Sequence, residues 1–158
     1  MIQYKKATLE ETELLVKTRI EVLRAANRLD EKTDMSEVEK QSEDYYRKAL
    51  AEGTHTAYLV FDEDKFIGAG GISYYRVMPT WHNISGEKGY IMNMYTKPEY
   101  RRRGIAFETL KRLVEDAEKH GINAVSLEAT DMGRPLYEKF GFKPMHSEME
   151  LCMLQRNG

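Results

Sequence analysis

The sequence lacks several features that mark large classes of proteins. Among its 158 residues there is one cysteine, Cys152, so neither an internal disulfide nor a cysteine metal cluster is expected. No apolar run approaches the roughly 20 residues that cross a bilayer, and the first residues lack the apolar stretch of a signal peptide. No spacing of histidine and glutamate resembles a metal site. We therefore expect a cytoplasmic protein that uses no metal and binds no membrane.

An excess of charge of one sign is also missing. The 24 Lys and Arg residues nearly balance the 26 Asp and Glu residues, and the net charge is −2. A protein that coats nucleic acid has a strong basic field, so no nucleic-acid partner is expected. Nucleic-acid binding through Lys97 and the arginines at 101–103 is the alternative, which a salt-dependent binding assay tests. Hydrophobic residues make up 41% of the chain and aromatic residues 10%, enough for one packed core.

The order of helical and extended patterns predicts one α/β domain over residues 1–158. Apolar residues recur at helical spacing in some segments and form short alternating or continuous runs in others. Helices are predicted at 9–27, 36–53, 105–120 and 135–140, and strands at 56–61, 66–77, 90–96, 124–129 and 149–154. A helix between two strands suggests that these strands are parallel neighbours in a mixed sheet.

A basic turn at residues 97–104 connects a buried strand to a helix. A loop that runs directly into a helix presents unpaired backbone N–H groups at the positive end of the helix dipole, where a pyrophosphate fits. Gly104 and Ala106 let phosphate oxygens approach the backbone, and the arginines at 101–103 add positive charge. A solvated turn explains the same residues equally well. The pattern is neither a Walker loop nor a dinucleotide-binding fingerprint.

The six residues from Arg101 to Ala106 resemble the signature of the GNAT superfamily of N-acetyltransferases. That signature has Arg or Gln, two variable residues, Gly, one variable residue, and Gly or Ala. The context is similar too, because an apolar strand ends at Thr96 before the motif. Downstream, residues 137–142 resemble the closing Tyr-x-x-x-Gly-Phe element of the family. The resemblance covers about residues 56–154, and the first 50 residues agree only in forming two helices.

The resemblance implies a fold and a co-substrate. The fold is a mixed, mostly antiparallel twisted sheet with a central splayed pair of parallel strands and helices on both faces. Residues 1–53 would shape the acceptor side, 56–130 the sheet and coenzyme core, and 131–158 a C-terminal helix and strands. The co-substrate is acetyl-CoA, whose pantetheine arm would pair with the splayed strand like an added strand. The coenzyme-binding residues would be Met94, Tyr95, Thr96, Arg101, Arg102, Arg103, Gly104, Ile105, Ala106 and Thr130.

The resemblance also implies acetyl transfer to a primary amine by direct attack through a tetrahedral intermediate. Tyr137 matches the tyrosine that faces the coenzyme sulfur, and a phenol with a pKa near ~10 can protonate the leaving thiolate. A main-chain N–H near Met94 would stabilise the oxyanion. The amine, with a pKa near ~10.4, must also lose a proton. Glu87, His82 and Glu128 are weak candidates for a base, so a water chain is the simplest assumption.

The acceptor is less well defined by the sequence. Seven acids and two bases lie between residues 30 and 44, which favours either a solvated helix face or a site that attracts a cationic amine. The candidate substrate-binding residues are Asp30, Asp34, Glu37, Tyr74 and Trp81. Amino acids, polyamines, aminoglycosides, peptide N-termini and protein lysines all remain open as acceptors.

Three further expectations concern an alternative function, the assembly of the protein and two of its histidines. A non-catalytic module that binds a CoA thioester for regulation is the alternative function. The family often dimerises through late strands, so a homodimer is considered. His55 and His120 flank glycines at the ends of predicted elements, which suggests capping or exposure to solvent.

Overall fold

The computed structural model of the protein describes residues 1–156, which fall into two compact units divided after Glu128. Of the described segments of the first unit, seven precede the basic turn, one lies within it and two follow it. In chain order the elements of this unit are β1 (Ile2–Lys6), η1 (Leu9–Glu11), α1 (Thr12–Asn27), α2 (Ser36–Glu52), β2 (His55–Asp62), β3 (Lys65–Arg76), β4 (Glu87–Thr96), η2 (Pro98–Tyr100), α3 (Ile105–Lys119) and β5 (Val125–Leu127).

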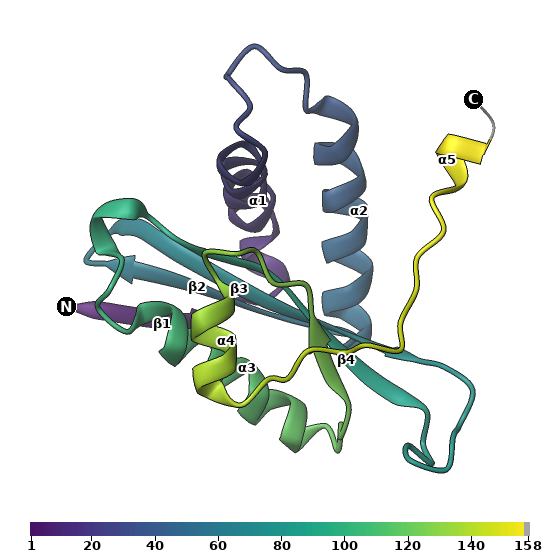
Figure 1. Cartoon of the computed structure of the whole chain (residues 1–158). Helices are drawn as coiled ribbons and strands as arrows, with labels where there is room; N and C mark the ends of the chain where they lie inside the picture. Colours follow the sequence, from purple (N-terminus) through teal and green to yellow (C-terminus); the bar gives the residue numbers. More distant parts are fainter. Residues whose placement is uncertain (157–158) are drawn as a thin grey trace. The chain divides into compact units, whose positions relative to one another are not determined.

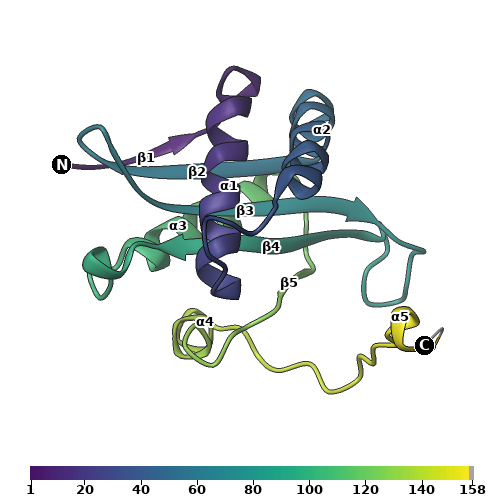
Figure 2. The ribbon, with the colours of Figure 1, turned by 90° about the horizontal axis from the view of Figure 1, so that it is seen from above.

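The five strands form one mixed sheet in the order β1-β2-β3-β4-β5. The first four strands pair antiparallel, and β4 pairs with β5 in parallel. Helices α1 and α2 cover one face of the sheet and α3 covers the other (Figures 1 and 2). The predicted mixed sheet with helices on both faces is therefore confirmed.

Side-chain alternation along β2 supplies a core to each face of the sheet, and β3 contributes to both because its pairing with β2 shifts by one residue between Phe66 and Gly68. On the α1 side, Leu15 packs in a cluster with Leu59 and Ala69, all of them buried. On the α3 side, Val60 and Ile67 pack with Ile105, the first residue of α3. Burial of each large aliphatic side chain stabilises the fold by about 1.5–3 kcal/mol. These two cores hold α1 and α3 on opposite faces of the sheet.

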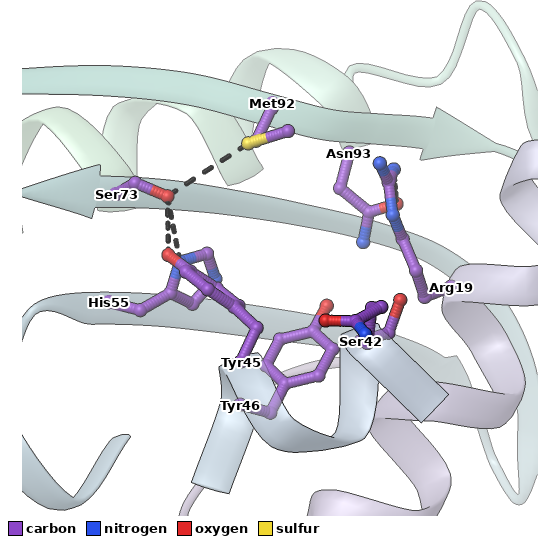
Figure 3. Close-up of a pocket in the computed structure, with 9 residues that line it drawn as sticks. Arg19, Ser42, Tyr45, Tyr46, His55, Ser73, Met92 and Asn93 are labelled. Atoms are coloured by element: carbon purple, nitrogen blue, oxygen red, sulfur yellow. Dashed lines mark hydrogen bonds between the residues drawn. The ribbon is translucent and has the colours of Figure 1, made fainter. Parts of the chain in front are cut away.

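A β-bulge interrupts β4 opposite Gly70. Ala69 pairs with Tyr95 and Gly71 pairs with Met92, so two residues of β4 face one residue of β3. Asn93, inside the bulge, has a φ of 61°, a left-handed conformation that asparagine tolerates better than most residues. The bulge breaks the usual alternation of side chains, and Met92 and Asn93 both point toward the α1–α2 face (Figure 3).

The parallel pairing of β4 with β5 is short. It runs from Gly89 with Val125 to Ile91 with Leu127. Within residues 1–156, the second half of β4 therefore has no strand partner on the side away from β3. This geometry agrees with the predicted splayed pair, which lies at the edge of the sheet rather than at its centre.

The second unit contains two helices among its described residues, α4 (Arg134–Phe140) and α5 (Met153–Arg156). The strand predicted at 149–154 is wrong, because residues 142–152 have no regular structure and the chain then turns into α5. Met149 is 98% exposed, and an extended segment without a partner strand leaves its backbone unpaired. The chain also begins with a strand that is not among the predicted ones, the five-residue β1.

In the part of the chain that is described, no helix combines the length and the apolar character needed to span a lipid bilayer.

Candidate active site

The basic turn places an open backbone surface in front of α3. Arg102 and Gly104 both have left-handed backbones, with φ of 64° and 78°. A Cβ atom added to Gly104 would meet no atom within 4 Å, so the space beside this residue is free. Gly104 is the N-cap of the 15-residue α3, whose first N–H groups lack helical partners. An anion placed here would meet these donors and the positive end of the helix dipole.

Contacts within the turn orient two of its arginines. Arg101 donates from Nε to the carbonyl oxygen of Thr96 over 3.1 Å, which ties the turn to the end of β4. The guanidinium of Arg103 lies 4.9 Å from the centre of the Tyr100 ring. Tyr100 in turn donates its hydroxyl to Asp62 over 2.7 Å. The guanidinium group of Arg101 is thus held against β4, and that of Arg103 is held near β2 through Tyr100.

The residues present fit a coenzyme with a diphosphate and an extended arm. The end of β4, with Met94, Tyr95 and Thr96, leads through the turn directly to Ile105 and Ala106 at the start of α3. Thr96 also carries a buried hydroxyl with no hydrogen-bond partner among the described residues. Backbone amides and arginines are suited to the diphosphate, and the unpaired edge of β4 is suited to an amide-containing arm.

Thr130 and Tyr137, the other two predicted residues, lie in the second unit. The hydroxyl of Thr130 accepts a hydrogen bond from the N–H of Gly133 over 3.1 Å. The Tyr137 ring packs so closely on Gly133 that a Cβ added there would lie 3.1 Å from it. It also meets Phe142 edge to face, with 6.1 Å between ring centroids. Burial raises the pKa of the Tyr137 phenol, so the hydroxyl keeps its proton well above neutral pH.

A cavity of about 250 Å³, here called the α1–α2 cavity, lies between these helices and the sheet (Figure 3). The residues that line this cavity come from five separate elements, so no local pattern in the sequence indicates it. They are Arg19, Gln41, Ser42, Tyr45, Tyr46, His55, Ser73, Met92 and Asn93.

One wall of the α1–α2 cavity is a hydrogen-bonded cluster of Tyr45, His55 and Ser73 (Figure 3). The Tyr45 hydroxyl lies 2.9 Å from Nδ1 of His55 and 2.6 Å from Oγ of Ser73. Burial, together with the nearby charge of Arg19, lowers the pKa of His55 to about 4. His55 is therefore a neutral hydrogen-bonding group at pH 7, and the expectation of an exposed histidine is wrong.

The opposite wall pairs Arg19 of α1 with Asn93 of the bulge. Arg19 donates from Nη1 to Oδ1 of Asn93 over 2.9 Å, and Figure 3 shows the two side chains side by side. This contact joins α1 to the strand that also leads into the basic turn.

The structure does not bring the three predicted acidic residues to the α1–α2 cavity. Asp30 accepts hydrogen bonds from the N–H groups of Lys32 and Thr33 in its own loop. Asp34 accepts from the N–H of Ser36 at the start of α2, and Glu37 accepts from Gln41. These carboxylates satisfy local donors, so their placement does not support a role in drawing a cationic acceptor.

Tyr74 and Trp81 also lie away from the α1–α2 cavity. Tyr74 follows Ser73 on β3, so strand alternation turns its side chain to the α3 face. There its hydroxyl donates to Asp116 over 2.5 Å and its ring stacks on His120 at 4.5 Å. Trp81 is 90% exposed in the segment between β3 and β4.

No group of three or more His, Cys, Asp or Glu side chains within residues 1–156 is arranged to hold a metal ion.

A strand that separates from its neighbour, a turn that presents free backbone N–H groups and a following helix define an α/β fold of the kind that the motif resembles. Comparison with known proteins identifies the family. Residues 22–142 match the Acetyltransferase (GNAT) family, and the chain belongs to it.

Two crystal structures share the fold of nearly the whole chain. A predicted acetyltransferase from Clostridium acetobutylicum, solved with acetyl-CoA, is 33% identical, with a TM-score of 0.88 and 98% of each chain covered. A GCN5-related N-acetyltransferase from Ralstonia eutropha is 24% identical, with a TM-score of 0.82 over 98% of this chain and 99% of its own.

Curated sequences match over shorter stretches. The uncharacterized N-acetyltransferase YsnE of Bacillus subtilis is 32% identical over 93 residues, which is 56% of either chain. The uncharacterized N-acetyltransferase YafP of Escherichia coli is 29% identical over 69 residues, 44% of this chain and 43% of its own. The match thus spans about half the length of these relatives.

Proposed function

We propose that the protein is an acetyl-CoA-dependent N-acetyltransferase that acts on a primary amine of a small molecule or a peptide. The observation that carries the proposal is the open backbone surface at Gly104, which a φ of 78° and the absence of neighbouring atoms leave free for a diphosphate. Family membership and the acetyl-CoA in the structure of the Clostridium relative support this assignment of the ligand.

Acetyl-CoA supplies the activated acetyl group when it is bound, and the chain supplies position and protons. The amide N–H groups at the start of α3 and the arginines of the basic turn hold the diphosphate. The unpaired half of β4 aligns the pantetheine arm, and a main-chain N–H near Met94 stabilises the developing oxyanion.

The proton balance of the reaction leaves a role for Tyr137, which the resemblance to the family suggests. The amine nitrogen adds to the acetyl carbon to form a tetrahedral intermediate, and the bond from that carbon to sulfur breaks when this intermediate collapses. The amine loses its proton to water, since none of the described side chains that line the α1–α2 cavity is a carboxylate and His55 is a weak base. Tyr137 donates its proton to the departing thiolate and regains one from solvent.

The test follows release of the free CoA thiol from acetyl-CoA with a panel of amines, alongside calorimetric titration with CoA. Turnover with at least one amine supports the transferase. Tight CoA binding without turnover by any amine would instead indicate a regulatory module that binds CoA thioesters. Failure to bind CoA in a folded sample overturns the proposal.

A further inference from the structure

We propose that the acceptor is a small amine that also carries an anionic group, and that Arg19 binds this group in the α1–α2 cavity. The inference rests on the proposed function and names the acceptor class for the same site. It differs from the prediction of a cationic acceptor that was based on the acidic segment at 30–44.

Arg19 is available for an anion. Its side chain is partly buried at the wall of the cavity, and its Nη1 donates to the neutral amide oxygen of Asn93. No carboxylate within residues 1–156 forms an ion pair with it. A guanidinium has five N–H donors in a planar fork, so one bond to Asn93 leaves donors for a bidentate contact with a carboxylate or a phosphonate.

The other cavity walls do not offset this positive charge. Among the described residues that line the cavity there is no Asp or Glu. Burial lowers the pKa of His55 to about 4 and raises the pKa of Tyr46 to about 12, so both side chains are neutral at pH 7. The lining therefore has a single net positive charge, from Arg19. Polyamines and aminoglycosides carry several positive charges. The charge of Arg19 would repel them inside the cavity, because water screens charges less there than at the surface.

The volume of the α1–α2 cavity and the position of Arg19 narrow the class of acceptor further. The cavity volume of about 250 Å³ is just below the usual ~300–1,000 Å³ of ligand sites, which indicates a small acceptor. Arg19 contacts Asn93, the residue next to Met94, whose main-chain N–H is proposed to face the reacting carbonyl. The anionic group and the reacting amine must therefore be separated by few bonds. Amino acids and short aminoalkyl phosphonates meet this requirement.

The first experiment compares matched pairs of acceptors. Kinetics with acetyl-CoA are measured for L-amino acids and their amides, for aminomethylphosphonate, for phosphoethanolamine and for spermidine. The amine of an amino acid amide is easier to deprotonate than the amine of the amino acid itself. A preference for the amino acid would therefore result from binding in the cavity and not from the reactivity of the amine. We expect kcat/KM to be at least about tenfold higher for an anionic amine than for its neutral partner, and the carboxylate and phosphonate arms distinguish the two kinds of anion.

The second experiment changes the charge of the cavity. Arg19→Gln removes the guanidinium, and Asn93→Asp keeps the acceptor oxygen while pairing Arg19 with a carboxylate. Both variants should raise KM for the anionic acceptor by about 10- to 100-fold and leave KM for acetyl-CoA unchanged. Lys17→Gln is the matched control, because Lys17 is exposed on the same helix and its loss changes the net charge equally. It should alter neither constant.

Calorimetry separates this inference from the proposed function. The CoA-saturated protein is titrated with the amino acids and amides, and thermal melting checks that each variant is folded. Selective binding of an anionic amine that is lost in both cavity variants supports the inference, whether or not turnover occurs. Equal or better use of spermidine or the amides, with no effect of Arg19→Gln, overturns it while leaving the transferase intact. A folded protein that binds neither CoA nor any anionic amine overturns both.

Discussion

The hydroxyl of Tyr45 lies 2.9 Å from Nδ1 of His55, and the two rings meet edge to face with 5.3 Å between their centroids. This contact joins α2 to β2 at one wall of the α1–α2 cavity. His55 is 7% exposed, and its ring fits there because Gly71 has no side chain; a Cβ on Gly71 would lie 2.9 Å from Nε2. Burial thus keeps the histidine neutral at pH 7, because its pKa is lowered to about 4.

The burial of His55 predicts that stability depends on pH. The pKa of His55 is about 4 in the folded protein, below the ordinary value of 6.5. The unfolded chain therefore binds a proton between these values while the folded protein does not, so stability falls as pH decreases from about 6.5 to about 4. The loss from this residue is on the order of 3 kcal/mol. Chemical denaturation at a series of pH values measures it.

A matched pair of variants isolates the contribution of His55. His55→Gln should flatten the decline in unfolding free energy over this pH range, whereas His82→Gln, in an exposed segment, should keep it. An equal slope in the wild type and in His55→Gln would show that other groups cause the acid loss of stability.

Gly104 offers a direct test of the coenzyme site. The Ala variant adds a Cβ in open space but strains a backbone with φ of 78°, at a cost of about 1 kcal/mol. The Glu variant adds the same strain together with a negative charge beside the diphosphate. We expect Gly104→Glu to weaken CoA binding by tenfold or more in calorimetry.

Gly121, which follows α3 and has a φ of 73° with no atom near its missing Cβ, provides the control. Gly121→Ala should cost similar stability and leave CoA affinity unchanged. If Gly104→Glu binds CoA as tightly as Gly121→Ala does, the diphosphate lies elsewhere.

Asp116 is the buried charge on the opposite face of the sheet. It is 6% exposed and accepts hydrogen bonds from Lys6, Thr56 and Tyr74 at 2.8, 2.6 and 2.5 Å. Asp116→Ala leaves these donors unpaired and should destabilise the fold by about 3 kcal/mol in urea titration. Glu115→Ala, an exposed neighbour on α3, should change stability by less than about 0.5 kcal/mol. Similar losses in both variants would mean that the cluster contributes little.

The parts of the fold that local sequence determines were predictable. The helix that starts after Gly104 and the strand that ends at Thr96 follow from apolar spacing and from glycine at a left-handed N-cap. The end of β4, the start of α3 and the basic turn between them therefore follow from the sequence, whereas β4 begins at Glu87, three residues before the predicted start.

The α1–α2 cavity depends on long-range register, which local patterns do not define. Whether Ser73 or Tyr74 faces α2 depends on how β3 pairs with β2, and a shift of one residue exchanges the two faces. The bulge that turns both Met92 and Asn93 into the cavity has no local signal except an asparagine that tolerates positive φ. The partners of Asp116 come from three segments that meet only in the folded protein.

The proposed proton donor, Tyr137, is tested by its Phe variant. Tyr137→Phe keeps the ring packing on Gly133 and Phe142 and removes only the hydroxyl. Since general acid catalysis contributes about 10²–10⁴-fold, kcat should fall within that range, while CoA affinity and thermal stability change little. Tyr75→Phe, at the exposed end of β3, serves as the control and should retain full activity.

The pH profile gives Tyr137 a second, independent test. Because burial raises the pKa of this phenol, the hydroxyl stays protonated at neutral and mildly alkaline pH, and deprotonation should lower kcat only at still higher pH. That high-pH decline should disappear in Tyr137→Phe, since the variant has no group to titrate. Measurements must be made where chemistry limits turnover, because slow product release would hide the effect. A Phe variant with more than about half of the wild-type kcat and an unchanged pH profile would contradict the assignment, and water would then protonate the thiolate.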